Sequence, residues 1–118
     1  MTTSATDRIH VFRQLHRAGC FVIPNPWDLG SARLLAQLGF RALATTSAGF
    51  AWSLGKPDGR VTLEEALGHL RAVAHGVALP VNADFEGGYA IEPAAVGSNV
   101  CRRDGNRNRR AFDRRFHG

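Results

Sequence analysis

Hydrophobic and polar residues follow one another in blocks that predict alternating helices and short strands. Within residues 6–18, apolar side chains recur at every third position, at Ile9, Phe12 and Leu15. This spacing predicts a short amphipathic helix. The next block, residues 20–23, is continuously apolar and predicts a strand, which Pro26 ends because proline cannot continue a strand ladder.

A second strand and helix are predicted downstream. Ser31 is expected to be the N-cap of a leucine-lined helix that ends at Gly39. Residues 41–46 predict the second strand, and residues 47–60 predict a long glycine-containing loop.

The third unit has the clearest boundary signals. Thr62 and Glu65 have the spacing of a capping box, which predicts a helix that ends near Gly76. Residues 79–84 predict a third strand, and Pro93 is expected to be the first residue of another helix. Strands separated by helices predict an α/β fold of parallel βαβ units with right-handed crossovers.

The charge of the chain is concentrated at its C-terminal end. The formal net charge is +5, but residues 1–98 contain eight basic and eight acidic residues. Residues 99–118 contain seven arginines against Asp104 and Asp113. The apolar period also stops after Val100, so we divide the chain into a structured part, residues 1–100, and a disordered Arg-rich tail, residues 101–118.

This tail suggests an alternative function, that of a small basic nucleic-acid-binding protein whose arginines contact phosphates. Against it, the tail has little aromatic interleaving. The chain has no apolar run of the roughly 20 residues that a membrane helix needs and no signal-peptide pattern, so a cytoplasmic location is expected. Cys20 and Cys101 are predicted to be ordinary thiols.

In parallel β/α folds, reactive groups lie at the carboxyl ends of strands. After the third strand, Asn82, Asp84 and Glu86 alternate and could face one side. Their oxygen atoms would suit a magnesium ion. A solvated loop with helix-capping acids is the alternative, and the spacing alone does not favour the metal site over it.

The loop after the second strand is built from small residues, so its backbone amides could approach an anionic oxygen closely. These residues are Ser47, Ala48 and Gly49. A plain glycine-containing turn is the alternative. Asp58, in the segment 56–59, has the sequence of a turn. The residues alone therefore predict a β/α domain with a possible oxyanion and divalent-metal site.

Six segments, in unbroken order over about residues 9–98, closely resemble the isocitrate lyase / phosphoenolpyruvate phosphomutase superfamily. They are residues 22–28, 30–33, 38–40, 44–49, 53–59 and 79–86. The resemblance implies a (β/α)₈ TIM-type barrel, Mg²⁺, and homo-oligomeric full-length relatives. It also implies cleavage or rearrangement of C–C or P–C bonds in small α-oxyacids or phosphonates through an enolpyruvate-like or oxalate-like intermediate, with lyase and phosphomutase both open.

The resemblance also assigns roles to residues. Asp58 corresponds to an acidic catalytic residue beside the metal site, and Asp84 corresponds to the magnesium ligand. Asn82 stands where the family has the first acid of a D-x-D pair, so it would contribute an oxygen or orient a metal-bound water without a charge. The loop that holds the substrate carboxylate and the enolate oxygen corresponds to Thr46, Ser47, Ala48 and Gly49.

A barrel of this type needs roughly 250 residues, whereas about three β/α units are present here. We therefore expect the N-terminal part of a barrel and an inactive fragment. With suitable synonymous codons, residues 105–118 read one base later give Glu-Thr-Gly-Ile-Ala-Gly-Leu-Ser-Ile-Glu-Asp-Ser-Thr-Gly. This peptide resembles the fourth strand and S-I-E-D motif of the family, so a shifted reading frame is expected in the tail.

Overall fold

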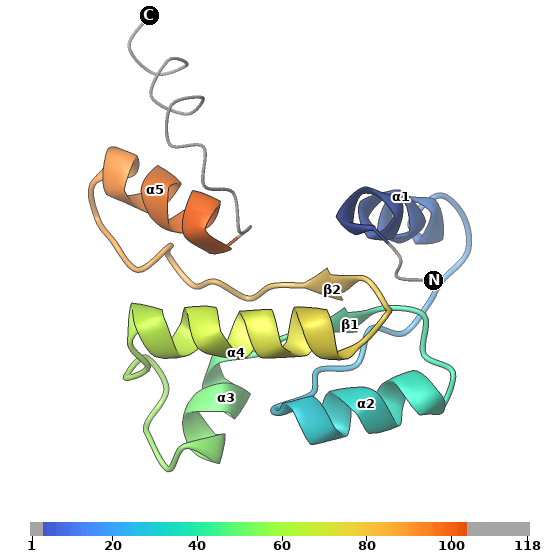
Figure 1. Cartoon of the computed structure of the whole chain (residues 1–118), viewed down its shortest axis with the longest axis horizontal. Helices are drawn as coiled ribbons and strands as arrows, with labels where there is room; N and C mark the ends of the chain where they lie inside the picture. Colours follow the sequence, from blue (N-terminus) through green and yellow to red (C-terminus); the bar gives the residue numbers. More distant parts are fainter. Residues whose placement is uncertain (1–3, 104–118) are drawn as a thin grey trace, which may run out of the picture.

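The computed structural model describes residues 4–103, which form five helices and a short parallel sheet. In chain order the elements are α1 (Ala5–Leu15), α2 (Leu29–Gln37), β1 (Leu43–Ala44), α3 (Ser47–Ser53), α4 (Leu63–Gly76), β2 (Val81–Asn82) and α5 (Pro93–Arg103). In the view of Figure 1, α4 runs alongside the strands, with α2 and α3 below them and α1 and α5 above.

The two strands are parallel neighbours, with Leu43 opposite Val81 and Ala44 opposite Asn82. Their register places both carboxyl ends at the same edge of the sheet. The predicted second and third strands are therefore confirmed in shorter form. Because β1 and β2 are joined through α3 and α4, this unit is the βαβ crossover that the alternating pattern predicts.

The strand predicted over residues 20–23 is wrong, because this segment has no regular strand structure. It still lies beside β1, where the Ala44 amide donates to the Pro24 carbonyl at 3.1 Å. Pro24 and Pro26 have no N–H group to donate, so the ladder cannot extend in both directions. The segment also leaves Val22 66% exposed.

The predicted N-cap of the second helix is also wrong. Asp28, not Ser31, caps α2, and its carboxylate accepts the Ser31 amide at 2.7 Å. Both residue types are good N-caps, so sequence alone could not separate them. The helix ends as expected near Gly39, which adopts a left-handed φ of 94°.

The loop predicted over residues 47–60 contains a helix, α3, which corrects that prediction. Thr46 caps it, and its hydroxyl accepts the Gly49 amide at 3.2 Å. We expected a loop here because residues 47–60 contain several glycines, but Gly49 is buried in the first turn of the helix. The close packing described below explains why a glycine is required there.

The boundaries of α4 and α5 agree closely with the sequence predictions. The capping box of Thr62 and Glu65 is present in both directions, and α5 begins at Pro93. Helix α5 continues through residue 103, so residues 101–103, which we assigned to the tail, belong to a helix. The rest of the tail lies outside the described residues, together with the expectation that it is disordered.

The core has three clusters, all of which involve α3, α4 or the strands. Leu43, Leu67 and Val73 are the largest side chains that are fully buried. Two arginines bind the C-terminal end of α4. Arg8 donates to the Ala74 carbonyl at 2.6 Å, and Arg33 donates to the Gly76 carbonyl at 3.2 Å. These arginines satisfy carbonyls that a helix end leaves without partners. Over residues 4–103, no helix has the length and apolar character needed to cross a membrane.

Candidate active site

The carboxyl ends of β1 and β2 are joined by three hydrogen bonds that alternate between the two segments. The Thr45 amide donates to the Asn82 carbonyl, the Asp84 amide donates to the Thr45 hydroxyl, and the Ser47 amide donates to the Asp84 carboxylate, each at 2.9 Å. Thr45 is buried, whereas Asp84 is exposed. The structure thus brings together the two loops that sequence analysis proposed separately as oxyanion and metal sites.

Asp84 is held as a carboxylate. Burial raises its pKa, but hydrogen bonds from Ser47 and from the Glu86 amide, the latter at 3.3 Å, outweigh this effect, so that the pKa lies below its ordinary value. A hydrogen bond to the charged form of an acid stabilises that form. Asp84 is therefore ionised at neutral pH, as a metal ligand must be.

Within the loop from Thr46 to Gly49, most polar groups already have partners. The Thr46 hydroxyl caps α3, and both the amide and the hydroxyl of Ser47 interact with Asp84. In the described structure the amides of Thr46 and Ala48 have no acceptor, so these two donors of the loop are free to bind an added anionic oxygen. The structure leaves fewer free donors than the sequence suggested.

Trp27 packs directly over Gly49. A Cβ atom built on Gly49 would lie 2.3 Å from Trp27 Cδ1 and 2.7 Å from Thr46 Cγ2, which is far inside van der Waals contact. Trp27 also meets the edge of Trp52, with ring centroids 5.5 Å apart. The sequence gives no sign of this contact, since Trp27 and Gly49 are 22 positions apart and share no pattern.

Asp58 lies in an exposed turn, closed by a hydrogen bond from the Arg60 amide to the Pro57 carbonyl at 3.2 Å. Gly59 has a left-handed φ of 79° there, which favours glycine. The residues alone predicted this turn, and the catalytic role implied for Asp58 stays a prediction.

The Asn82 side chain is exposed, and its side-chain amide group makes no hydrogen bond within residues 4–103.

The donor set fits a magnesium ion only in a particular way. No group of three or more His, Cys, Asp or Glu side chains is close enough to hold a metal ion anywhere in the described part of the chain. Magnesium, however, often binds through one or two carboxylates and retains several waters. An ionised, exposed Asp84, with the uncharged Asn82 two residues before it, fits such a hydrated ion and does not fit a closed protein cage.

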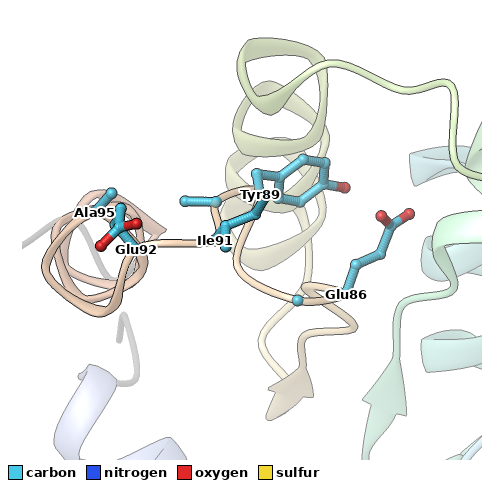
Figure 2. Close-up of a pocket in the computed structure, with 7 residues that line it drawn as sticks. Glu86, Tyr89, Ile91, Glu92 and Ala95 are labelled. Carbon is cyan, nitrogen blue, oxygen red and sulfur yellow. The ribbon is translucent and has the colours of Figure 1, made fainter.

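Tyr89 is a further residue of this region that sequence analysis missed. Burial, together with the negative charges of Glu86, Asp84 and Asp58, raises the pKa of Tyr89 to about 12. Figure 2 shows the Tyr89 hydroxyl and the Glu86 carboxylate on the same side of their loop, pointing away from Ala95 of α5. The Tyr89 hydroxyl therefore keeps its proton at neutral pH.

The loop after β2 is conformationally strained. Glu86 and Tyr89 have left-handed φ values of 46° and 58°, and Gly88 between them has a φ of 76°. A non-glycine residue in this region costs of order 1–3 kcal/mol. The Asn99 side chain donates to the Gly88 carbonyl at 2.8 Å and the Gly88 amide donates to the Phe85 carbonyl at 2.9 Å, which hold the loop in place.

His69 of α4 packs on Phe50 of α3, and its buried ring nitrogen has no hydrogen-bond partner among the described residues. The two rings are stacked with centroids 3.9 Å apart, and the nitrogen without a partner is Nε2. Burial lowers the pKa of His69, and the Asp28 carboxylate offsets part of this effect. His69 is thus a neutral packing residue at pH 7.

Polar groups at the carboxyl ends of parallel strands are the site arrangement of parallel β/α enzymes, which include the (β/α)₈ barrels. The sequence profile of phosphoenolpyruvate phosphomutase matches residues 12–103. The chain therefore belongs to the phosphoenolpyruvate phosphomutase family, and the predicted membership of its superfamily with isocitrate lyase is confirmed.

Known relatives agree with this assignment. An uncharacterized protein of Mycobacterium tuberculosis is 40% identical over 91 residues, which cover 76% of this chain and 35% of the relative. A solved structure from Burkholderia cenocepacia J2315, described as that of a candidate lyase/mutase, is 44% identical with a TM-score of 0.80 and covers 84% of this chain and 36% of its own. Oxaloacetate acetylhydrolase in complex with the product oxalate is 30% identical with a TM-score of 0.70, over 79% of this chain and 34% of its own.

The chain spans about a third of the length of the curated relatives it matches. Its described residues have the fold of the N-terminal part of a (β/α)₈ barrel, as predicted. Arg102, one of the arginines on which the nucleic-acid alternative depends, forms an ion pair with Glu64 within this fold. The Arg102 side chain thus contacts α4 from α5. The alternative function, that of a nucleic-acid-binding protein, is not favoured.

Proposed function

We propose that this chain provides the N-terminal part of the active site of a magnesium-dependent enzyme that cleaves or rearranges C–C or P–C bonds in small α-oxyacids. The observation that carries the proposal is the hydrogen bond from the Ser47 amide to the Asp84 carboxylate. It joins the loop proposed to hold the substrate with the acid proposed to hold the metal.

Each residue of the site has a proposed role that follows from its chemistry. The free amides of Thr46 and Ala48 are the groups suited to donate to a substrate carboxylate or to an oxygen that becomes negative during reaction. Asp84 would hold magnesium, with Asn82 through a water, and bound magnesium would supply positive charge beside the developing enolate. Asp58 would orient a water in this shell from its turn. Relatives that include a lyase/mutase and an oxaloacetate acetylhydrolase support this class of reaction.

Calorimetric titration of the 118-residue chain with oxalate, with and without Mg²⁺, tests the proposal. Oxalate carries two carboxylates and mimics a planar enolate, so we expect it to bind when Mg²⁺ is present and to bind weakly when it is absent. Asp84→Asn removes the charge that holds the metal and should abolish the Mg²⁺-dependent part of the binding.

Asp7→Asn is the matched control, since Asp7 is also an exposed acid that accepts hydrogen bonds at the start of a helix, but it lies in α1. Its oxalate binding should equal that of the unchanged chain. Oxalate binding that is equally strong with and without Mg²⁺ would contradict the proposed function. Mg²⁺-dependent binding that is unchanged in Asp84→Asn would contradict it as well.

We further propose that the described residues alone do not form a complete catalytic centre, because no three of their metal-ligating side chains converge. Purified 118-residue protein should therefore show ligand binding without appreciable lyase or phosphomutase turnover. A full-length relative assayed on the same α-oxyacids serves as the positive control, and clear Mg²⁺-dependent turnover by this chain would overturn this part of the proposal.

A further inference from the structure

Strand β2 forms one edge of the sheet, and a row of its backbone groups points away from β1. The sheet of the described structure consists of β1 and β2. The carbonyls of Pro80 and Asn82 face β1, where they accept amides of the first strand at 3.0 and 2.9 Å. Because the backbone groups of successive residues in a strand point to opposite sides, those of Val81 and Ala83 point to the open edge. The Ala83 amide has no acceptor among residues 4–103.

This edge lacks the features that usually prevent two strands from pairing. Exposed edges in soluble proteins commonly carry charged side chains, or a proline that removes a donor. Residues 77–83 contain no charged side chain. Pro80 directs its carbonyl towards β1, so its missing N–H group does not interrupt the outer row. The edge is therefore able to accept another strand.

The edge is also complementary to itself. When two copies of β2 meet in antiparallel orientation about a two-fold axis at Asn82, Val81 of each copy lies opposite Ala83 of the other. Each of these two pairs can exchange two backbone hydrogen bonds. The two Asn82 side chains then lie directly opposite each other across the axis.

Asn82 suits this central position. Its side chain is exposed, and its amide group makes no hydrogen bond among the described residues. A carboxamide both donates and accepts, so two of them that face each other can bond to one another. An aspartate in the same place would set two like charges opposite each other, which is destabilising.

We propose that β2 pairs with β2 of a second copy of this chain, in antiparallel orientation and centred on Asn82. The contact between two short strands is small, so the homodimer is weak and dissociates on dilution. The inference is independent of the proposed function, because the pairing uses no metal and no substrate.

Sedimentation equilibrium of the whole chain in EDTA, over a wide range of concentration, tests the pairing. We expect the apparent mass to rise from 12.8 kDa towards twice this value as the concentration rises. Asn82→Asp should weaken the dimer about tenfold, because it sets two negative charges across the axis. Asn25→Asp is the matched control, since it adds the same charge at an exposed position on the other side of β1, and should leave the association unchanged. Circular dichroism checks that both variants are folded.

Hydrogen exchange followed by NMR locates the interface. The amides of Val81 and Ala83 should be protected at high concentration, and should exchange faster on dilution and in Asn82→Asp. Protection of the Ala83 amide that does not change with concentration would mean that another part of the same chain covers the edge, and would overturn the inference.

Two further outcomes would also overturn it. One is a monomer at every concentration. The other is a dimer that is equally strong in Asn82→Asp, which would assign the association to another surface, such as the exposed Leu34 and Leu38 side chains of α2 and its C-cap. Because EDTA removes Mg²⁺, none of these outcomes changes the result expected for the Asp84-dependent oxalate binding that tests the proposed function.

Discussion

The Thr45 hydroxyl accepts the Asp84 amide at 2.9 Å, and it does so from a position that is only 5% exposed. This contact fixes the backbone of the loop after β2 to the end of β1. It sets the place of the Asp84 carboxylate before any ligand binds, which is the arrangement that a preorganised site requires.

Thr45→Val should destabilise the fold. The substitution retains the shape of the side chain but removes the partly buried hydrogen bond to the Asp84 amide, which typically costs about 0.5–1.5 kcal/mol. Urea unfolding followed by circular dichroism would measure the change. Ser53→Ala, which removes a hydroxyl bond to the Phe50 carbonyl on an exposed helix end, is the control and should change stability by less than about 0.5 kcal/mol.

Gly49→Ala and Gly68→Ala should have opposite effects. A methyl group at Gly49 would collide with Trp27, so we expect a loss of about 1–3 kcal/mol and a shift in tryptophan emission. Gly68 lies within α4 with nothing within 4 Å of its Cβ position, so alanine there should stabilise by about 0.5–1 kcal/mol. Equal effects at the two positions would show that Trp27 does not pack on Gly49.

His69 should make stability depend on pH near neutrality. Burial lowers its pKa in the folded state, so below the unfolded value of about 6.5 the unfolded chain binds a proton more readily. Stability is therefore complete above pH 7 and falls as the pH drops from about 7 towards 5. His69→Phe keeps a ring against Phe50 and should flatten this part of the profile, measured as free energy of unfolding in urea. An unchanged slope in that variant would assign the effect to another group.

The carboxylates act in a lower pH range. Asp84, Asp28 and Glu65 have pKa values below their ordinary ones. Their contribution to the free energy of unfolding is therefore present above about pH 4 and is lost as the pH falls through their pKa values in the folded state. The His69 effect can thus be measured above pH 5 without interference from these acids.

Asp28→Ala should destabilise the chain, because Asp28 caps α2 through the Ser31 amide. Removal of an N-cap acid typically costs 0.5–2 kcal/mol. Ser31→Ala is the matched test, since Ser31 lies inside the first turn and the substitution should be nearly neutral. Urea unfolding of the two variants measures the difference. If Ser31→Ala destabilised the chain more than Asp28→Ala, Ser31 would be the N-cap.

The sequence by itself predicted the helices α1, α2, α4 and α5 and the strands β1 and β2 in their order, but not α3. The capping box at Thr62, the proline at the start of α5 and the apolar runs of β1 and β2 depend on contacts within a few residues, which local patterns report directly. The family motifs predicted Asp84 and the loop after β1 as site residues, and the pattern places both after strand ends; their roles stay predictions.

Tertiary structure decided the rest. Whether residues 20–23 form a strand depends on the hydrogen bonds that a neighbouring strand can make, and the prolines there prevent a full ladder. Helix α3 packs against Trp27 because Gly49 has no side chain and leaves room for the indole. No local sequence pattern indicates this contact. The bond between Ser47 and Asp84 joins residues 37 positions apart. Such contacts form only when parallel pairing of β1 and β2 brings their carboxyl ends to one edge, so packing, and not sequence spacing, assembled the site.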